Sequence, residues 1–80
     1  MDIKFFTAGQ GLIKMEINNK PSDWAISNNG GKWQLYKMHT DISIAEDLAP
    51  VIHNDKELAK RVAQYIQEAT DGNVFMAYNR

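Results

Sequence analysis

The chain lacks cysteine altogether, has only two prolines, and shows no excess of either charge sign. Without cysteine it has no disulfide, no thiol nucleophile and no cysteine ligands for zinc or iron–sulfur clusters. Nine basic against ten acidic residues, net −1, exclude a polybasic nucleic-acid tail and an acidic mimic of DNA. A hydrophobic content of 44% excludes a disordered chain.

Long apolar runs are also missing. No window approaches the roughly 18 uninterrupted apolar residues of a membrane span, and the first four residues are no basic leader ahead of an apolar stretch. Together with the absence of cysteine, this predicts a cytoplasmic protein with no membrane partner. Eighty residues suffice for one small domain, 1–80, built around a single core.

Glycine positions predict the first of two hairpins. In residues 3–17, a three-residue loop Gly9-Gln10-Gly11, with Gly11 in the left-handed conformation, matches apolar residues with apolar ones across the strands. The predicted opposite pairs are Ile3 with Ile17, Phe5 with Met15, Thr7 with Ile13, and Lys4 with Glu16.

A two-residue turn at Asn29-Gly30 predicts the second hairpin and brings both tryptophans onto one face. The predicted opposite pairs are Ile26 with Trp33 and Trp24 with Leu35. Residues 18–23, between the hairpins, are a cluster of turn formers. The segment 3–38 is therefore predicted to be a four-stranded antiparallel meander.

Apolar residues at spacings of three and four predict a helix over 55–70, with Asn54 as its N-cap and Glu57 three residues on. Ser43 followed by Glu46 suggests a capping box and a short helix over about 43–49, although Ile42 and Ile44 alternate as in a strand. The apolar segment 74–78 is expected to form a fifth strand or to pack across the sheet. The predicted fold is thus α+β: a four- to five-stranded antiparallel meander packed on one C-terminal helix.

Alternation assigns the strand residues to two faces. One face is almost entirely apolar and is the expected core side, covered by the helix. The other is mixed, with large apolar groups that a solvated sheet face does not need, and such patches mark contact surfaces. The candidate partner-binding residues on it are Phe6, Leu12, Tyr36 and Met38, with Lys4, Lys14 and Lys32.

Three explanations compete for this mixed face. Segment 74–78 or segment 42–52 folds over it; or it is a homodimer or protein-partner interface, where aromatics and methionine are favoured; or it binds single-stranded nucleic acid. In that last case Phe6 and Tyr36 stack on bases while the three lysines meet phosphates. The net charge of −1 counts against nucleic acid, because phosphate binding needs uncompensated cations.

Charge is uneven along the chain. Residues 1–40 hold five lysines against three acids, net +2, and residues 41–80 hold seven acids against four bases, net −3. Acids in the stretch after residue 40 form either a solvated loop and first helical turn or an acidic edge that docks on a basic partner. The residues of this acidic edge are Asp41, Glu46 and Asp47.

The motifs of catalysis are weak. No G-x-S-x-G elbow surrounds a serine, and the glycine pairs lead into strands rather than helices, so they are hairpin turns and not phosphate loops. Metal binding would need the His39/Asp41 junction to meet the His53/Asp55 junction, and nothing in the sequence brings them together. The sequence therefore predicts no catalytic residue, no metal site and no cofactor.

The favoured function is a small non-enzymatic protein-interaction module, an inhibitor or regulator of the accessory type found in phages and mobile elements, with a homodimer expected. Single-stranded nucleic-acid binding by the same sheet face is the alternative. A metal-dependent enzyme at the two histidine junctions ranks third.

Overall fold

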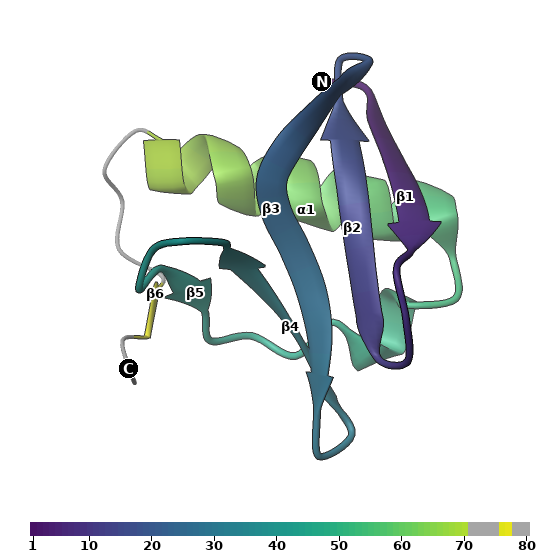
Figure 1. Cartoon of the computed structure of the whole chain (residues 1–80), viewed down its shortest axis with the longest axis vertical. Coiled ribbons are helices and arrows are strands. Elements are labelled where there is room, and N and C mark those ends of the chain that lie inside the picture. Colours follow the sequence, from purple (N-terminus) through teal and green to yellow (C-terminus); the bar gives the residue numbers. More distant parts are fainter. Residues whose placement is uncertain (71–75, 78–80) are drawn as a thin grey trace.

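The computed structural model describes residues 1–70 and 76–77 of the chain. It confirms the predicted α+β class, with an antiparallel meander followed by one main helix (Figure 1). The strands lie side by side in chain order. The elements are β1 (Ile3–Thr7), β2 (Leu12–Ile17), β3 (Lys20–Asn29), β4 (Lys32–Lys37), β5 (Ser43–Ile44), the 3₁₀ turn η1 (Ala49–Val51), α1 (Asp55–Thr70) and β6 (Met76–Ala77).

The first hairpin has the predicted register, including Phe5 opposite Met15 and Lys4 opposite Glu16. Gly11 is left-handed, with φ +67°, and the Ala8 N–H donates to the Leu12 carbonyl across the loop at 2.9 Å. This agreement follows from the side-chain period, because a two-residue loop would shift the register by one and put the apolar residues of the two strands on opposite faces.

The register predicted for the second hairpin is wrong by two residues. Ile26 lies opposite Leu35, not Trp33, and Trp24 lies opposite Lys37, because the turn is Gly30-Gly31 rather than Asn29-Gly30. Both glycines have positive φ, +66° and +91°, which glycine adopts more cheaply than asparagine. A slip of two residues preserves the side-chain alternation, so both tryptophans remain on the predicted face.

The turn between the two hairpins is shorter than predicted. Asn18 and Asn19 take the left-handed conformation, with φ 54° and 66°, and β3 already begins at Lys20. Within the predicted turn region, Pro21 pairs with Glu16 in the ladder.

The sequence leaves a short helix over about 43–49 and a strand open as alternatives, and of these the helix is wrong. Ser43 and Ile44 form β5, which adds to β4 with Ser43 opposite Tyr36, and the turn η1 follows only at Ala49. Ile44 is buried in the core, and strand pairing is what carries it there. The strand-like alternation of Ile42 and Ile44 outweighs the capping-box pattern.

The helix α1 has the predicted bounds and crosses one face of the sheet, here called the inner face (Figure 1). Asn54 caps it, since the Glu57 N–H donates to Asn54 Oδ1 at 3.1 Å. The core lies between sheet and helix. Its buried members are Met15, Trp24, Ile26, Leu35, Ile44, Leu48, Ile52, Leu58, Val62, Tyr65 and Ile66.

The face of the sheet opposite α1 is here called the outer face. Segment 42–52 does not fold over this face, so that interpretation of the sequence is wrong. Its apolar residues Ile44, Leu48 and Ile52 join the core on the inner side. In the segment 74–78, Met76 and Ala77 pair with β5 as a further strand at the sheet's far edge. The rest of that segment lies outside the described residues.

Candidate functional site

The outer face of the sheet is the surface that the sequence singles out. Cross-strand pairing builds one continuous row over five strands, in which each member lies opposite the next. The row is Phe6, Lys14, Ala25, Tyr36 and Ser43. Phe6 at its β1 end keeps 47% of its surface exposed, whereas Ala25 in the middle is fully buried between larger neighbours. The row is therefore exposed to solvent at its β1 end and buried at its centre.

A bulge between β2 and β3 hollows this face. The register shifts between Lys14 and Glu16, and three residues of β3 then lie opposite Met15 alone. Ser22 holds the bulge, because its Oγ donates to the Met15 carbonyl at 2.9 Å and accepts from the Trp24 N–H at 3.3 Å.

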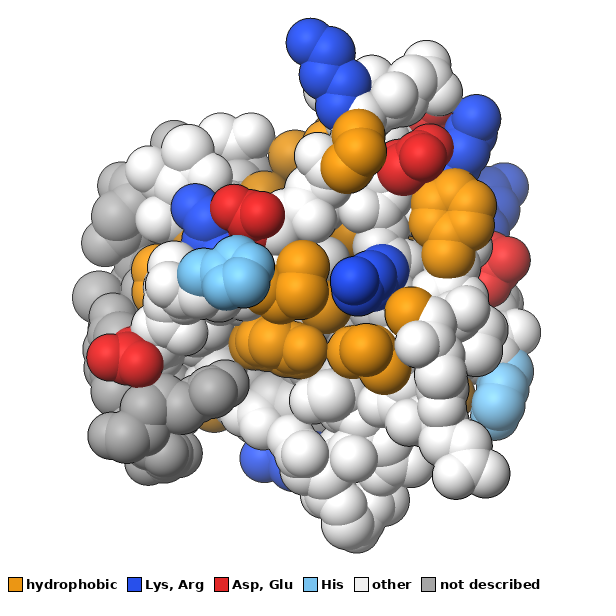
Figure 2. Space-filling view, in the orientation of Figure 1, with side chains coloured by type: hydrophobic (Ala, Val, Ile, Leu, Met, Phe, Trp, Pro, Cys, Tyr) orange, Lys and Arg blue, Asp and Glu red, His pale blue; other side chains and the backbone are white. Residues whose placement is uncertain are grey.

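The hollow is a pocket of about 340 Å³, here called the outer pocket. Its lining residues are Phe6, Ala8, Lys14, Met15, Glu16, Pro21, Ser22 and Met38. In Figure 2, hydrophobic side chains gather over the middle of the sheet and surround a blue basic side chain. Large apolar groups and one cation thus share a concave surface, the usual arrangement of an interface centre.

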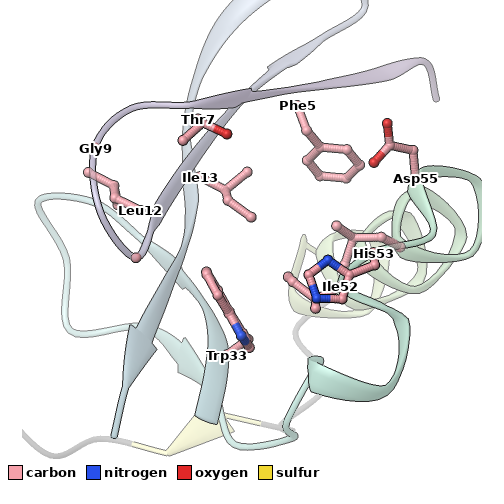
Figure 3. Close-up of a pocket in the computed structure, with 11 residues that line it drawn as sticks. Phe5, Thr7, Gly9, Leu12, Ile13, Trp33, Ile52, His53 and Asp55 are labelled. Atoms are coloured by element: carbon pink, nitrogen blue, oxygen red, sulfur yellow. The ribbon is translucent and has the colours of Figure 1, made fainter. Parts of the chain in front are cut away.

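A second pocket, here called the inner pocket, opens between the first hairpin and the start of α1. It also measures about 340 Å³. Its lining residues are Phe5, Thr7, Gly9, Gly11, Leu12, Ile13, Trp33, Ile52, His53, Asp55 and Leu58. Figure 3 shows Phe5, Ile13 and Trp33 on the sheet side, facing Ile52 and His53.

Sequence reasoning missed the inner pocket. The sequence predicts Phe5 and Trp33 on the core face, and they do pack against the core, but both are only partly buried because this pocket opens beside them. For His53 and Asp55 the sequence suggests only a possible role as metal ligands. No periodicity signals the pocket, because the path of the chain from β5 through η1 to α1 creates it.

The structure gathers some predicted contact residues and separates others. Phe6, Lys14 and Met38 line the outer pocket, and Tyr36 lies two strands from Lys14 in the same row. Leu12 instead lines the inner pocket, and Lys32 pairs with Asn29 at the tip of the second hairpin.

Lys4 does not line the outer pocket, and a neighbouring acid partly offsets its charge. It is opposite Glu16 across the hairpin, and its Nζ donates to Asn19 Oδ1 at 3.2 Å. Lys14 is thus the one predicted lysine that lines the outer pocket, where Glu16 also lies.

The predicted acidic edge divides into residues with different roles. Asp41 is exposed in the turn after β4. Asp47 Oδ1 accepts the backbone N–H groups of Trp33 and Ala49, each at 2.9 Å, so this carboxylate ties the chain after β5 to the start of β4. The hydrogen bond from Ala49, which has the larger effect, and the one from Trp33 both lower the pKa of Asp47.

Glu46 joins the acidic stretch to the helix. Its carboxylate accepts from the Tyr65 hydroxyl and forms an ion pair with Arg61, at 3.4 Å from Oε1 to Nη1. Desolvation, followed by the hydrogen bond to Glu46, raises the pKa of Tyr65 above its ordinary value. Two of the three acids therefore make contacts within the chain.

The described residues contain no cluster of metal-binding side chains. Within 1–70 and 76–77, no three His, Asp or Glu side chains come together as a metal site requires. In the same part of the chain, no helix is long and apolar enough to cross a membrane.

Comparison with known proteins adds no relative: no family model, no curated protein and no solved structure matches the chain.

Proposed function

We propose that the chain is a small non-enzymatic protein-interaction module, an inhibitor or regulator of the phage or mobile-element accessory type, that binds a protein partner through its outer sheet face. The observation that carries this proposal is the outer pocket, with the half-exposed Phe6 and the partly buried Met38 lining it. When a partner covers an exposed aromatic group, the complex is stabilised by about 25 cal/mol for each Å² of apolar surface removed from water.

Within the described residues, packing on the core does not account for Phe6. The helix α1 packs on the opposite face, and residues 42–52 join the core on that same inner side. The Phe6 ring therefore points away from the core, next to Lys14. A solvated sheet face is stable with a polar residue here, so the aromatic is better explained by binding.

The test compares Phe6→Ser with Lys60→Ser, a change of exposed charge on α1. Protein tagged at one end is used to capture partners from the native host, and bound proteins are identified by mass spectrometry. We expect a partner that the wild type and Lys60→Ser retain and that Phe6→Ser loses, with thermal unfolding nearly unchanged in both variants. Equal capture by all three proteins would contradict the proposal.

Single-stranded nucleic acid is the second candidate, because Phe6, Lys14 and Tyr36 share one row across the sheet. It predicts that a labelled oligonucleotide binds at low salt, and that binding weakens steeply with added salt and on Lys14→Glu. The pairing of Lys4 with Glu16 weighs against it, since that acid offsets one of the cations. No binding at low salt would remove this candidate.

A further inference from the structure

β1 is an edge strand: in the described sheet it pairs with β2 on one side and with no strand on the other (Figure 1). The even-numbered residues on this segment direct their backbone groups toward β2. At its two ends, the Asn18 N–H donates to the Asp2 carbonyl and the Ala8 N–H donates to the Leu12 carbonyl. Bonding alternates along an antiparallel pair. The N–H and C=O groups of Ile3, Phe5 and Thr7 therefore point away from β2, toward the open edge.

The inner pocket lies beside this open edge. Phe5 and Thr7, two of the three residues with outward backbone groups, also line the pocket, and His53 and Asp55 line it from the start of α1 (Figure 3). A strand added along β1 would place every second side chain on the inner face, the face on which the pocket opens. Unpaired backbone groups and a place for a side chain thus coincide.

The pocket also has a chemical preference. Its walls include Phe5, Ile13 and Trp33, and among its lining residues Asp55 is the one acid, with no lysine or arginine. An apolar side chain accompanied by a basic one matches this lining. A second copy of β1 matches it less well, because its inner-face residues Ile3, Phe5 and Thr7 bring no cation.

We propose that the open edge of β1 accepts an extended peptide segment of a partner protein as an added strand, with one large apolar side chain in the inner pocket and a basic side chain against Asp55. Main-chain hydrogen bonds to Ile3, Phe5 and Thr7 supply affinity, and the pocket supplies specificity. This surface is distinct from the outer face, so the inference stands or falls independently of the proposed function.

The probe is an acetylated, amidated heptapeptide, Thr-Lys-Thr-Phe-Thr-Lys-Thr, whose lysines and phenylalanine fall on one face of a strand. Titration into isotope-labelled protein is followed by amide chemical shifts and hydrogen exchange. We expect saturable binding, with shifts at inner-pocket residues and slower exchange of the Ile3, Phe5 and Thr7 amides.

Control peptides isolate each contact. Replacing phenylalanine by alanine, replacing both lysines by glutamate, or methylating the phenylalanine backbone nitrogen is expected to weaken binding about tenfold or more. The methylated peptide tests strand pairing without changing the protein, so the test does not depend on a variant that folds.

Protein variants test the same contacts from the other side. Thr7→Pro removes an outward N–H and should bind about tenfold more weakly than Thr7→Ala, which changes the same pocket-lining side chain but keeps the N–H. Asp55→Asn should weaken binding of the lysine peptide, and Glu57→Gln, the same loss of charge in the same helical turn, should not.

Three results would overturn the proposal: no shift at millimolar peptide, shifts confined to the outer pocket, or equal affinity of the methylated peptide. Protection of the three amides that rises with protein concentration in the absence of peptide would also overturn it, because the occupant would then be a second copy. Loss of peptide binding in Phe6→Ser with the inner pocket intact would overturn it as well, because the peptide would then bind through the outer face.

Discussion

Asp47 shows how a single side chain takes on a structural role that its sequence context does not announce. It lies in an acid-rich stretch that is typical of a solvated loop, yet its Oδ1 accepts two backbone N–H groups from separate parts of the chain. A carboxylate that accepts backbone hydrogen bonds favours its charged form, which is why the pKa of Asp47 is lowered. Its charge therefore contributes to folding.

Asp47→Ala is expected to lower the free energy of unfolding at neutral pH, because it leaves the Trp33 and Ala49 N–H groups without this acceptor. In the wild type the contribution is present above the ordinary aspartate pKa of about 4 and is lost as pH falls through the lower folded value. Urea unfolding from about pH 2 to 6 should therefore show a flatter pH dependence in the variant. Asp41→Ala is the control, and an equal loss of stability there at neutral pH would contradict this assignment.

At the scale of elements, α1 is the part of the fold whose beginning is specified locally. The Asn54 side chain accepts from the Glu57 N–H, and its carbonyl accepts the first helical hydrogen bond, from Leu58, at 2.8 Å. Acidic residues Asp55 and Glu57 stand in the first turn, where they favour the helix dipole. These local signals are independent of the sheet, so the start of the helix was predictable.

Asn54→Ala should destabilise the protein by about 1 kcal/mol, the usual cost of removing an N-cap, whereas Asn54→Ser should retain most of the stability. Because native domains have free energies of unfolding of only about 5–15 kcal/mol, that loss is measurable by thermal or urea unfolding. If alanine and serine gave the same stability, the side-chain cap would contribute nothing.

At the scale of the whole molecule, the two sheet faces differ in what they do. The inner face carries the core, with Ile26 and Leu35 fully buried opposite each other. The outer face is hollowed beside Phe6, which is half exposed. Apolar residues on the two faces should therefore respond very differently to truncation.

Leu35→Ala should cost about 2–5 kcal/mol and unfold much of the protein, because it removes transfer free energy and leaves a cavity. Phe6→Ala should cost far less, since the ring already contacts water in the folded state. Circular dichroism melts of the two variants against wild type measure the difference. A loss at Phe6 as large as that at Leu35 would mean that the outer face is core, and it would remove the basis of the proposed function.

The sequence by itself determined the fold class, the first hairpin register, the faces of both tryptophans and the extent of α1. These follow from local period, loop length and capping, and each is read from residues close together in the chain. Even the misplaced second turn left the face assignment intact, because two residues are one full period of a strand.

Only the tertiary structure decided where the site residues meet. The β2–β3 bulge that forms the outer pocket and the pairing of Ser43 with Tyr36 join segments that are close in the chain, yet no periodicity predicts their register. The position of Leu12 in the inner pocket depends on a contact between distant segments, because Ile52 and His53 line the same pocket. The acids Glu46 and Asp47 likewise find partners 14 to 19 residues away in the chain. Such contacts are selected by packing of the whole chain, and packing leaves no periodic signal in the sequence.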